Sequence, residues 1–179
     1  MIRYRPILEE DLTPSLFSAF IRRQAVTQCW RKRSGVWRIE SDPFVDDWNE
    51  TDHQALISSL RRTLEGQGAV YGAFDGPLLK GFVSLEGTML GSRAQYMDLS
   101  HLYVSQELRG SGIGRRLFSF AKQFARSRHA EKLYLSAHSA VESQAFYHAM
   151  GCVEAEEYDA AHVNAEPYDC QLEYRLSYM

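Results

Sequence analysis

Cysteine, proline and an excess of positive charge are all missing or scarce in this sequence. Its 179 residues include 3 cysteines and 5 prolines, and 20 lysines and arginines stand against 23 aspartates and glutamates, for a net charge of -3. Cys29, Cys152 and Cys170 have no CxxC spacing, which argues against a disulfide framework or a zinc site and favours a reducing compartment. The charge balance gives no reason to expect a nucleic-acid partner.

Long apolar runs are also absent. No stretch approaches the roughly 20 consecutive apolar residues of a membrane-spanning helix. The opening residues, MIRYRPILEED, contain no apolar run of signal-peptide length. The sequence also lacks internal repeats. These absences predict a cytoplasmic protein with no membrane partner, and the length predicts that residues 1–179 form a single domain.

The sequence does contain enough apolar residues, 45% of the total, for a substantial core. Helices are expected from Thr13-Pro14 through residue 24, over 50–66, from 113 to 129 and over 141–150, whereas 27–49 has no clear period and is expected to be a partly ordered excursion. Strands are expected at 2–8, 69–74, 78–87, 95–104, 132–137, 152–158 and 169–178. This order of elements predicts an α+β fold with a mixed central sheet.

A glycine-rich stretch lies between an expected strand and an expected helix. Residues 102–118 read LYVSQELRGSGIGRRLF, so Gly110, Gly112 and Gly114 alternate within five positions. Unpaired N–H groups at a helix start, approached closely through glycines, make a cradle for an anion such as phosphate. The spacing matches neither a P-loop nor a dinucleotide fingerprint. A turn that only reverses the chain is the alternative.

Two motifs together resemble one protein family. The run Arg109-Gly110-Ser111-Gly112-Ile113-Gly114 resembles the R/Q-x-x-G-x-G/A motif of the GNAT acetyltransferase superfamily. About 30 residues further on, FYHAMGC (146–152) resembles the family's F-Y-x-x-x-G-F signature, with Cys152 in place of the aromatic residue. The resemblance covers about residues 68–158.

The resemblance implies a fold and a co-substrate. The fold would be the GNAT fold, a mixed, mostly antiparallel central sheet of about seven strands flanked by helices, splayed between strands 97–104 and 132–137. The co-substrate would be acetyl-CoA. Backbone of the strand before the motif would pair with the pantetheine arm, and loop amides would hold the pyrophosphate. The residues concerned are Leu102, Tyr103 and Val104 for the arm and Arg109, Gly110, Ser111, Gly112, Ile113, Gly114 and Arg115 for the pyrophosphate. Ala140 replaces a frequent family asparagine, which removes one side-chain contact to CoA.

Acetyl transfer to an amine needs a base, because an ammonium ion has no lone pair. Asp98 precedes Arg109 by eleven residues, a spacing that resembles the catalytic glutamate of some family members; a solvated aspartate is the alternative. His101 is the second candidate base, although on a regular strand it faces opposite to Asp98. Tyr147 resembles the family tyrosine that protonates the departing sulfur. No histidine spacing indicates a metal.

The segment SDPFVDDWNETD (41–52) combines five carboxylates with Phe44 and Trp48. It is either a solvated helix start or a rim that attracts a cationic amine.

Three functions remain open. The first is acetyl-CoA-dependent N-acetylation of a primary amine on a small molecule. The second is acetylation of a protein lysine or N-terminus, and the third is a non-catalytic acyl-CoA sensor. A homodimer also remains open.

Overall fold

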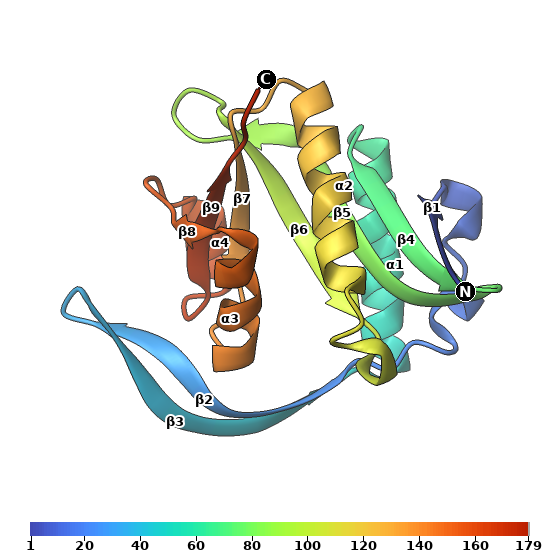
Figure 1. The fold of residues 1–179 in the computed structure, drawn as a ribbon, viewed down its shortest axis with the longest axis horizontal. Helices are drawn as coiled ribbons and strands as arrows, with labels where there is room; N and C mark the ends of the chain where they lie inside the picture. The colour runs from blue at the N-terminus through green and yellow to red at the C-terminus, as the bar shows by residue number, and fades with distance from the viewer. Residues whose placement is uncertain (179) are drawn as a thin grey trace.

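The computed structural model describes residues 1–178 and contains a seven-stranded sheet (Figure 1). In spatial order the strands are β1 (Ile2–Pro6), β4 (Ala69–Asp75), β5 (Leu78–Leu90), β6 (Tyr96–Val104), β7 (Lys132–Ala137), β9 (Cys170–Arg175) and β8 (Val153–Glu154). Every neighbouring pair is antiparallel except β6 and β7, which are parallel. The predicted mixed, mostly antiparallel seven-stranded sheet is therefore confirmed.

Helices cover both faces of this sheet. The four helices are α1 (Glu50–Glu65), α2 (Ile113–Ser127), α3 (Val141–Met150) and α4 (Ala160–Ala165). α2 buries an apolar face that includes Leu117, Phe118 and Ala121 in one core cluster, while α1 packs into a second cluster that contains Leu60 and Phe82. In Figure 1, α2 lies in front of the sheet and α1 behind it. Apolar residues at helical spacing produced this arrangement, as the sequence pattern indicated.

The sheet splays at the centre, between β6 and β7. The two strands pair at only three positions, of which Asp98 opposite Tyr134 is the last. Beyond that point β6 continues beside β5, and β7 continues beside β9. A wedge-shaped opening therefore separates the carboxyl ends of the two parallel strands.

The β5–β6 pairing contains a bulge beside the splay. Ser84 lies opposite His101 and Leu85 lies opposite Leu99, so Ser100 is an extra residue in β6. An inserted residue reverses the alternation of side chains along a strand. Asp98 and His101 consequently share one face, not the opposite faces expected of a regular strand.

The N-terminal region differs most from the sequence-based expectations. The helix expected through residue 24 is only a 3-10 turn, Pro14–Phe17. The expected excursion at 27–49 is instead part of a hairpin of β2 (Arg23–Arg33) and β3 (Val36–Asp47). Its tight turn is Ser34-Gly35, and both residues have positive φ, as two-residue hairpin turns require. Much of the hairpin is solvent-exposed, so its strands lack the apolar alternation that marks a half-buried strand.

Near the C-terminus, the strand expected at 152–158 was wrong beyond its first residues. Only Val153–Glu154 form a strand, and the short helix α4 follows. Asp159 caps that helix through its side chain, which accepts from the N–H of His162 at 3.0 Å. The cap explains why the chain turns away from the sheet at this point.

Candidate active site

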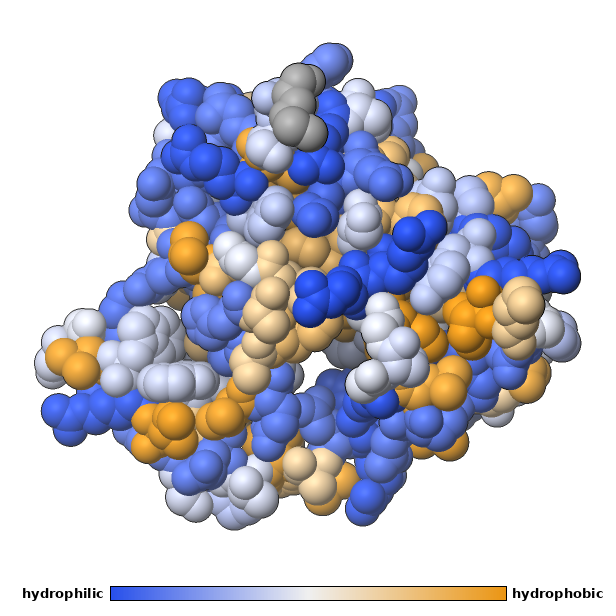
Figure 2. Space-filling view, viewed as in Figure 1, coloured by the Kyte–Doolittle hydropathy of each residue, from blue (hydrophilic) through white to orange (hydrophobic). Residues whose placement is uncertain are grey.

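The hairpin closes the open end of the splay. From the β6 side, where the Ile21 N–H donates to Ser105 Oγ at 2.9 Å, it runs across to the start of α3. There the Trp30 N–H donates to the Ser139 carbonyl at 2.8 Å, and Cys29 forms a bridge with Ala140. The cavity behind it measures about 770 Å³ and is partly open to solvent. In the orientation of Figure 1, the surface is hollowed between the hairpin and the body of the molecule (Figure 2).

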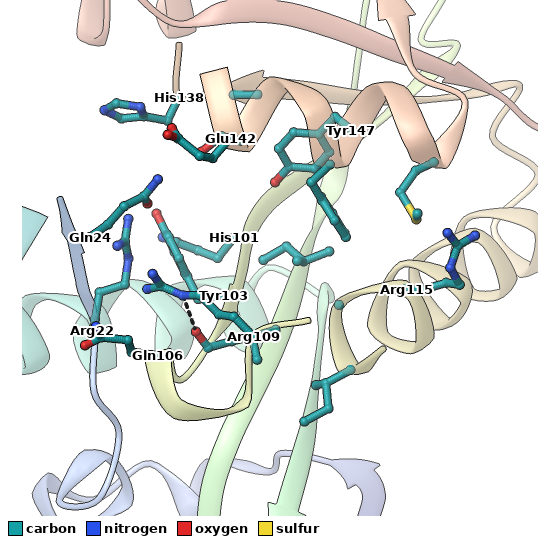
Figure 3. Close-up of a pocket in the computed structure, with 18 of the residues that line it drawn as sticks. Arg22, Gln24, His101, Tyr103, Gln106, Arg109, Arg115, His138, Glu142 and Tyr147 are labelled. Atoms are coloured by element: carbon teal, nitrogen blue, oxygen red, sulfur yellow. Dashed lines mark hydrogen bonds between the residues drawn. The ribbon is translucent and has the colours of Figure 1, made fainter. Parts of the chain in front are cut away.

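Four segments supply the cavity wall. They are the upper part of β6, the glycine loop with the first turn of α2, the end of β7 with α3, and the start of β2. Charged and polar side chains from all four converge on the cavity (Figure 3). Residues labelled there include Arg22 just before β2 and Gln24 within it, His101 and Tyr103 from β6, Arg109 and Arg115 around the loop, and Glu142 and Tyr147 from α3.

The glycine loop presents bare backbone to the cavity. Gly110 and Gly112 have φ angles of +78° and +87°, and a Cβ added at either would meet no atom within 4 Å. Gly112 is the N-cap of α2, so the N–H groups that follow it have no acceptor within the helix. Open space over free N–H groups at a positive helix end fits an anionic group such as a pyrophosphate.

The third glycine is required by packing. A Cβ on Gly114 would lie 3.1 Å from the Phe146 ring of α3. Gly114 therefore allows α2 and α3 to approach each other closely, and this contact joins the two motifs identified in the sequence. Arg109 lies at the other end of the loop, where its Nε donates to the Val104 carbonyl at 3.3 Å. Burial, together with the charge of Arg22, lowers the pKa of Arg109.

The edge of β6 offers the cavity a second set of backbone groups. Leu102, Tyr103 and Val104 all line the cavity. Because β7 pairs with β6 only as far as Asp98, the β6 backbone beyond that residue has no strand partner on the β7 side. An extended ligand can pair with such a free edge as another strand would.

Tyr147 lies across the cavity from β6. Its side chain points from α3 into the space, as Figure 3 shows. Burial raises its pKa above the usual value for tyrosine, and the charges of Tyr103, Cys152 and Asp169 act in the same direction. The phenol is therefore protonated at neutral pH and can donate a proton or a hydrogen bond.

His101 lines the cavity but is a weak base. Its Nδ1 lies 2.8 Å from Ser84 Oγ. Burial lowers the pKa of His101 to about 4. The ring is therefore neutral at pH 7, and a proton on it would be readily lost.

Asp98 is placed at the apex of the splay and does not line the cavity. Its side chain is 8% exposed, and its Oδ2 lies 2.7 Å from Nε2 of His162 in α4. Its other oxygen is buried without a hydrogen-bond partner among residues 1–178. The sequence gave no sign of this pair, because the two residues lie 64 positions apart.

The acidic segment 41–52 is largely neutralised. Asp42 pairs with Arg31, and Asp46 pairs with Arg22 at 2.8 Å. Asp52 accepts from the N–H of Asn49 in a capping box at the start of α1. Of the five carboxylates only Asp46 reaches the cavity wall. Most of the segment's charge therefore serves the hairpin and the helix start.

Sequence reasoning missed the residues that the hairpin brings to the site. Arg22 is buried, and its guanidinium lies over the rings of Tyr103 and Trp48. Gln24 is its neighbour along the cavity wall. The Ser34-Gly35 turn was the one local signal that could have revealed the hairpin.

Within residues 1–178, no helix has the length and apolar character needed to cross a membrane. The same part of the chain has no cluster of three or more histidine, cysteine or acidic side chains placed to hold a metal ion.

The comparisons with known proteins agree with the geometry. The family profile described as "Acetyltransferase (GNAT) domain" matches residues 40–172. No curated protein matches the chain.

Among solved structures, nourseothricin acetyltransferase is 21% identical, with a TM-score of 0.69 over 96% of this chain and 95% of that one. A Bacillus anthracis protein named as a streptothricin acetyltransferase, solved with acetyl coenzyme A, is 16% identical, with a TM-score of 0.69 over 100% and 99%. An aminoglycoside 6'-N-acetyltransferase, solved with coenzyme A, is 16% identical, with a TM-score of 0.57 over 74% and 86%. At these identities the likeness is one of fold.

Proposed function

This chain belongs to the GNAT acetyltransferase family, and from that premise we propose that it transfers the acetyl group of acetyl-CoA to a primary amine of a small molecule. Residues 1–179 act in this as one domain. The observation that carries the proposal is the single cavity shared by the glycine cradle, the free edge of β6 and Tyr147.

The residues present fit acetyl-CoA. The open space over Gly110 and Gly112 accommodates a pyrophosphate on the N–H groups from Arg109 to Arg115. The free edge from Leu102 to Val104 accommodates an extended pantetheine arm. Bound in this way, acetyl-CoA supplies an activated acetyl group. Two of the similar structures hold coenzyme A or its acetyl form, which supports this assignment.

In the proposed reaction the chain's own residues hold the reactants and move protons. The hairpin and α3 enclose the amine beside β6 and keep bulk water away. Tyr147, whose phenol is protonated at neutral pH, gives its proton to the leaving sulfur. Of the two candidate bases, His101 lines the cavity, but a pKa of about 4 leaves it little ability to hold a proton. Asp98 lies outside the cavity wall, so it can act on the amine only through an intervening group.

The hairpin across the acceptor side supports a small molecule. A protein lysine would need an open groove, but β2 and β3 span the splay and join the start of α3. The names of the similar structures, nourseothricin, streptothricin and aminoglycoside acetyltransferases, are consistent with this class of acceptor. The three cysteines are free and buried, which supports a cytoplasmic setting.

The test is a thiol-release assay with acetyl-CoA and a panel of acceptors. We expect release of CoA with aminoglycoside or streptothricin amines and none with a lysine-containing peptide. Turnover of the peptide alone would favour the protein acetyltransferase. Tight binding of acetyl-CoA without thiol release under any amine would favour a sensor and contradict the proposal.

A further inference from the structure

An Asp–His pair lies at the apex of the splay. Nε2 of His162 approaches Oδ2 of Asp98 at 2.7 Å, and the His162 ring stacks on Tyr134 with 5.5 Å between centroids. β6 supplies the aspartate, β7 the tyrosine and α4 the histidine. Three elements distant in sequence thus fix the orientation of one imidazole.

The pair adjoins the cavity. Asp98 and Tyr134 form the last β6–β7 pair, and the residues that follow them, Leu99 and Leu135, line the cavity. A second connection runs through Asp169, which accepts from Ser136 Oγ of the cavity wall at 3.0 Å.

The charge of Asp169 affects both His162 and Tyr147. Hydrogen bonding to Asp98 raises the pKa of His162, and the charges of Asp98, Asp159 and Asp169 add to the rise. Burial raises the pKa of Tyr147, and Asp169 contributes there as well. The charge of Asp169 therefore acts on both the imidazole and the phenol.

We propose that His162 is the base of the reaction: its Nδ1 takes the proton of the acceptor ammonium, directly or through one water, while Asp98 positions the ring. This inference rests on the proposed acetyl transfer and assigns a residue of that same site. Asp98, the base predicted from the sequence, becomes a positioning residue.

Exposure decides which member of the pair meets the amine. The His162 side chain is 28% exposed, whereas that of Asp98 is 8% exposed and one of its oxygens already faces the imidazole. A neutral ring that donates from Nε2 to the carboxylate leaves the lone pair of Nδ1 free. The carboxylate then stabilises the imidazolium that forms, as in other Asp–His pairs.

The groups facing His162 suit a proton acceptor that works near neutral pH. They are Asp98 from β6, Tyr134 from β7, Asp159 at the start of α4 and Asp169 before β9, and Glu86 of β5 acts on Asp98 from the other side. The balance of negative charge favours the protonated ring. A histidine whose pKa lies above its usual 6.5 is a stronger base for an amine than a free carboxylate.

The proton and electron balance of the step is complete. The ammonium gives one proton to His162 Nδ1, and the freed nitrogen lone pair forms the C–N bond with the acetyl carbonyl carbon. The C–S bond breaks, and the sulfur takes the Tyr147 proton. The phenol recovers a proton from the acylated nitrogen through water, and His162 releases its proton to solvent before the next turnover.

Three variants test the role of His162. His162→Gln keeps a donor toward Asp98 but removes the base, and we expect kcat/KM to fall roughly 10²-fold or more at pH 7. The decrease of kcat/KM toward acidic pH, the acidic limb of the pH profile, should also disappear. Asp98→Asn keeps the shape but removes the charge, and should move that limb to lower pH. Asp159→Asn keeps a helix cap and leaves the bond between the His162 ring and Asp98 intact, so it should move the acidic limb less.

Titration of the histidine ring protons by NMR gives a readout independent of turnover. The His162 signal should titrate above pH 6.5 in the parent protein and at lower pH in Asp98→Asn. Turnover that survives in His162→Gln with an unaltered pH profile would overturn the role of His162 alone. Absence of thiol release from the parent protein with every amine would overturn the acetyl transfer on which the inference depends.

Discussion

At the residue scale, the proposed function depends on a few positions where backbone N–H groups, and not side chains, bind acetyl-CoA. Gly112 combines a left-handed φ with open space above it, so the helix start can be approached closely. Any side chain at position 112 is strained by the left-handed φ, and a large one also fills the cradle. These two effects can be separated by substitution.

Gly112→Glu should abolish binding of acetyl-CoA, because a carboxylate would occupy the cradle opposite the phosphates. Like charges in contact cost several kcal/mol, so we expect roughly a hundredfold or greater loss of affinity by calorimetry. Gly112→Ala is the control, since its methyl group meets no atom within 4 Å and its cost is about 1–2 kcal/mol of backbone strain. Unchanged affinity in Gly112→Glu would refute the cradle assignment.

Tyr147→Phe should lower kcat much more than it weakens binding of acetyl-CoA, because the phenol acts on the leaving sulfur. General acids contribute roughly 10²–10⁴-fold, and the expected loss at saturating amine lies in that range. Tyr168→Phe is the matched control, because Tyr168 is exposed and lies outside the cavity wall. An unaltered kcat in Tyr147→Phe would remove the tyrosine from the mechanism.

At the element scale, the β2–β3 hairpin spans the open end of the splay and forms one wall of the cavity. Arg31 anchors it near its far end, where the guanidinium donates to Ser139 Oγ at 2.6 Å and pairs with Asp42. The Arg31 side chain is 10% exposed, and its contact with Ser139 is buried. Arg33, two residues further on, pairs with Glu40 in an exposed position.

Arg31→Ala should loosen the hairpin, because it removes the side-chain contact from β2 to Ser139, before α3, and leaves only the backbone contacts there. We expect faster hydrogen–deuterium exchange over residues 23–47 and a rise of roughly tenfold in KM for the amine, equivalent to about 1.4 kcal/mol. Arg33→Ala should change neither quantity, since exposed ion pairs contribute little. Equal effects of the two variants would show that the anchor is not specific.

At the scale of the whole molecule, stability should depend on two histidines with opposite shifts. Burial holds the pKa of His101 at about 4 in the folded protein, against 6.5 in the unfolded chain. The unfolded state therefore binds the proton first as pH falls from 6.5 to 4, and folding loses stability across that window. His162, whose pKa is raised, adds stability below pH 6.5 and loses that contribution as pH rises through its higher folded value.

His101→Gln should therefore flatten the acid side of the stability curve. Measured by denaturant unfolding between pH 6.5 and 4, the parent protein should lose about 3 kcal/mol more than the variant, corresponding to a shift of about 2.5 pKa units. His129→Gln, at an exposed site after α2, should follow the parent curve. A parent and a His101→Gln variant with parallel curves would contradict the buried, neutral state of His101.

The sequence by itself determined the elements whose signals are local. α1 and α2 show apolar residues at helical spacing, the central strands are bounded by turn residues, and the glycines stand between a strand and a helix. The spacing of the two motifs then predicted the family and the mixed sheet. Tyr147 could be named as a candidate for the same reason, since its proposed role comes from a motif read along the chain.

Tertiary structure alone decided the acceptor side of the site. The hairpin lacks a strong period because much of it is exposed, and its strands are held by pairing with each other and by contacts to the start of α3. Asp98 and His162 pair although they lie 64 positions apart in the sequence, and no local sequence pattern indicates which residues will contact each other over such a separation. The bulge at Ser100 likewise arises from pairing with β5, and it alone places Asp98 and His101 on one face.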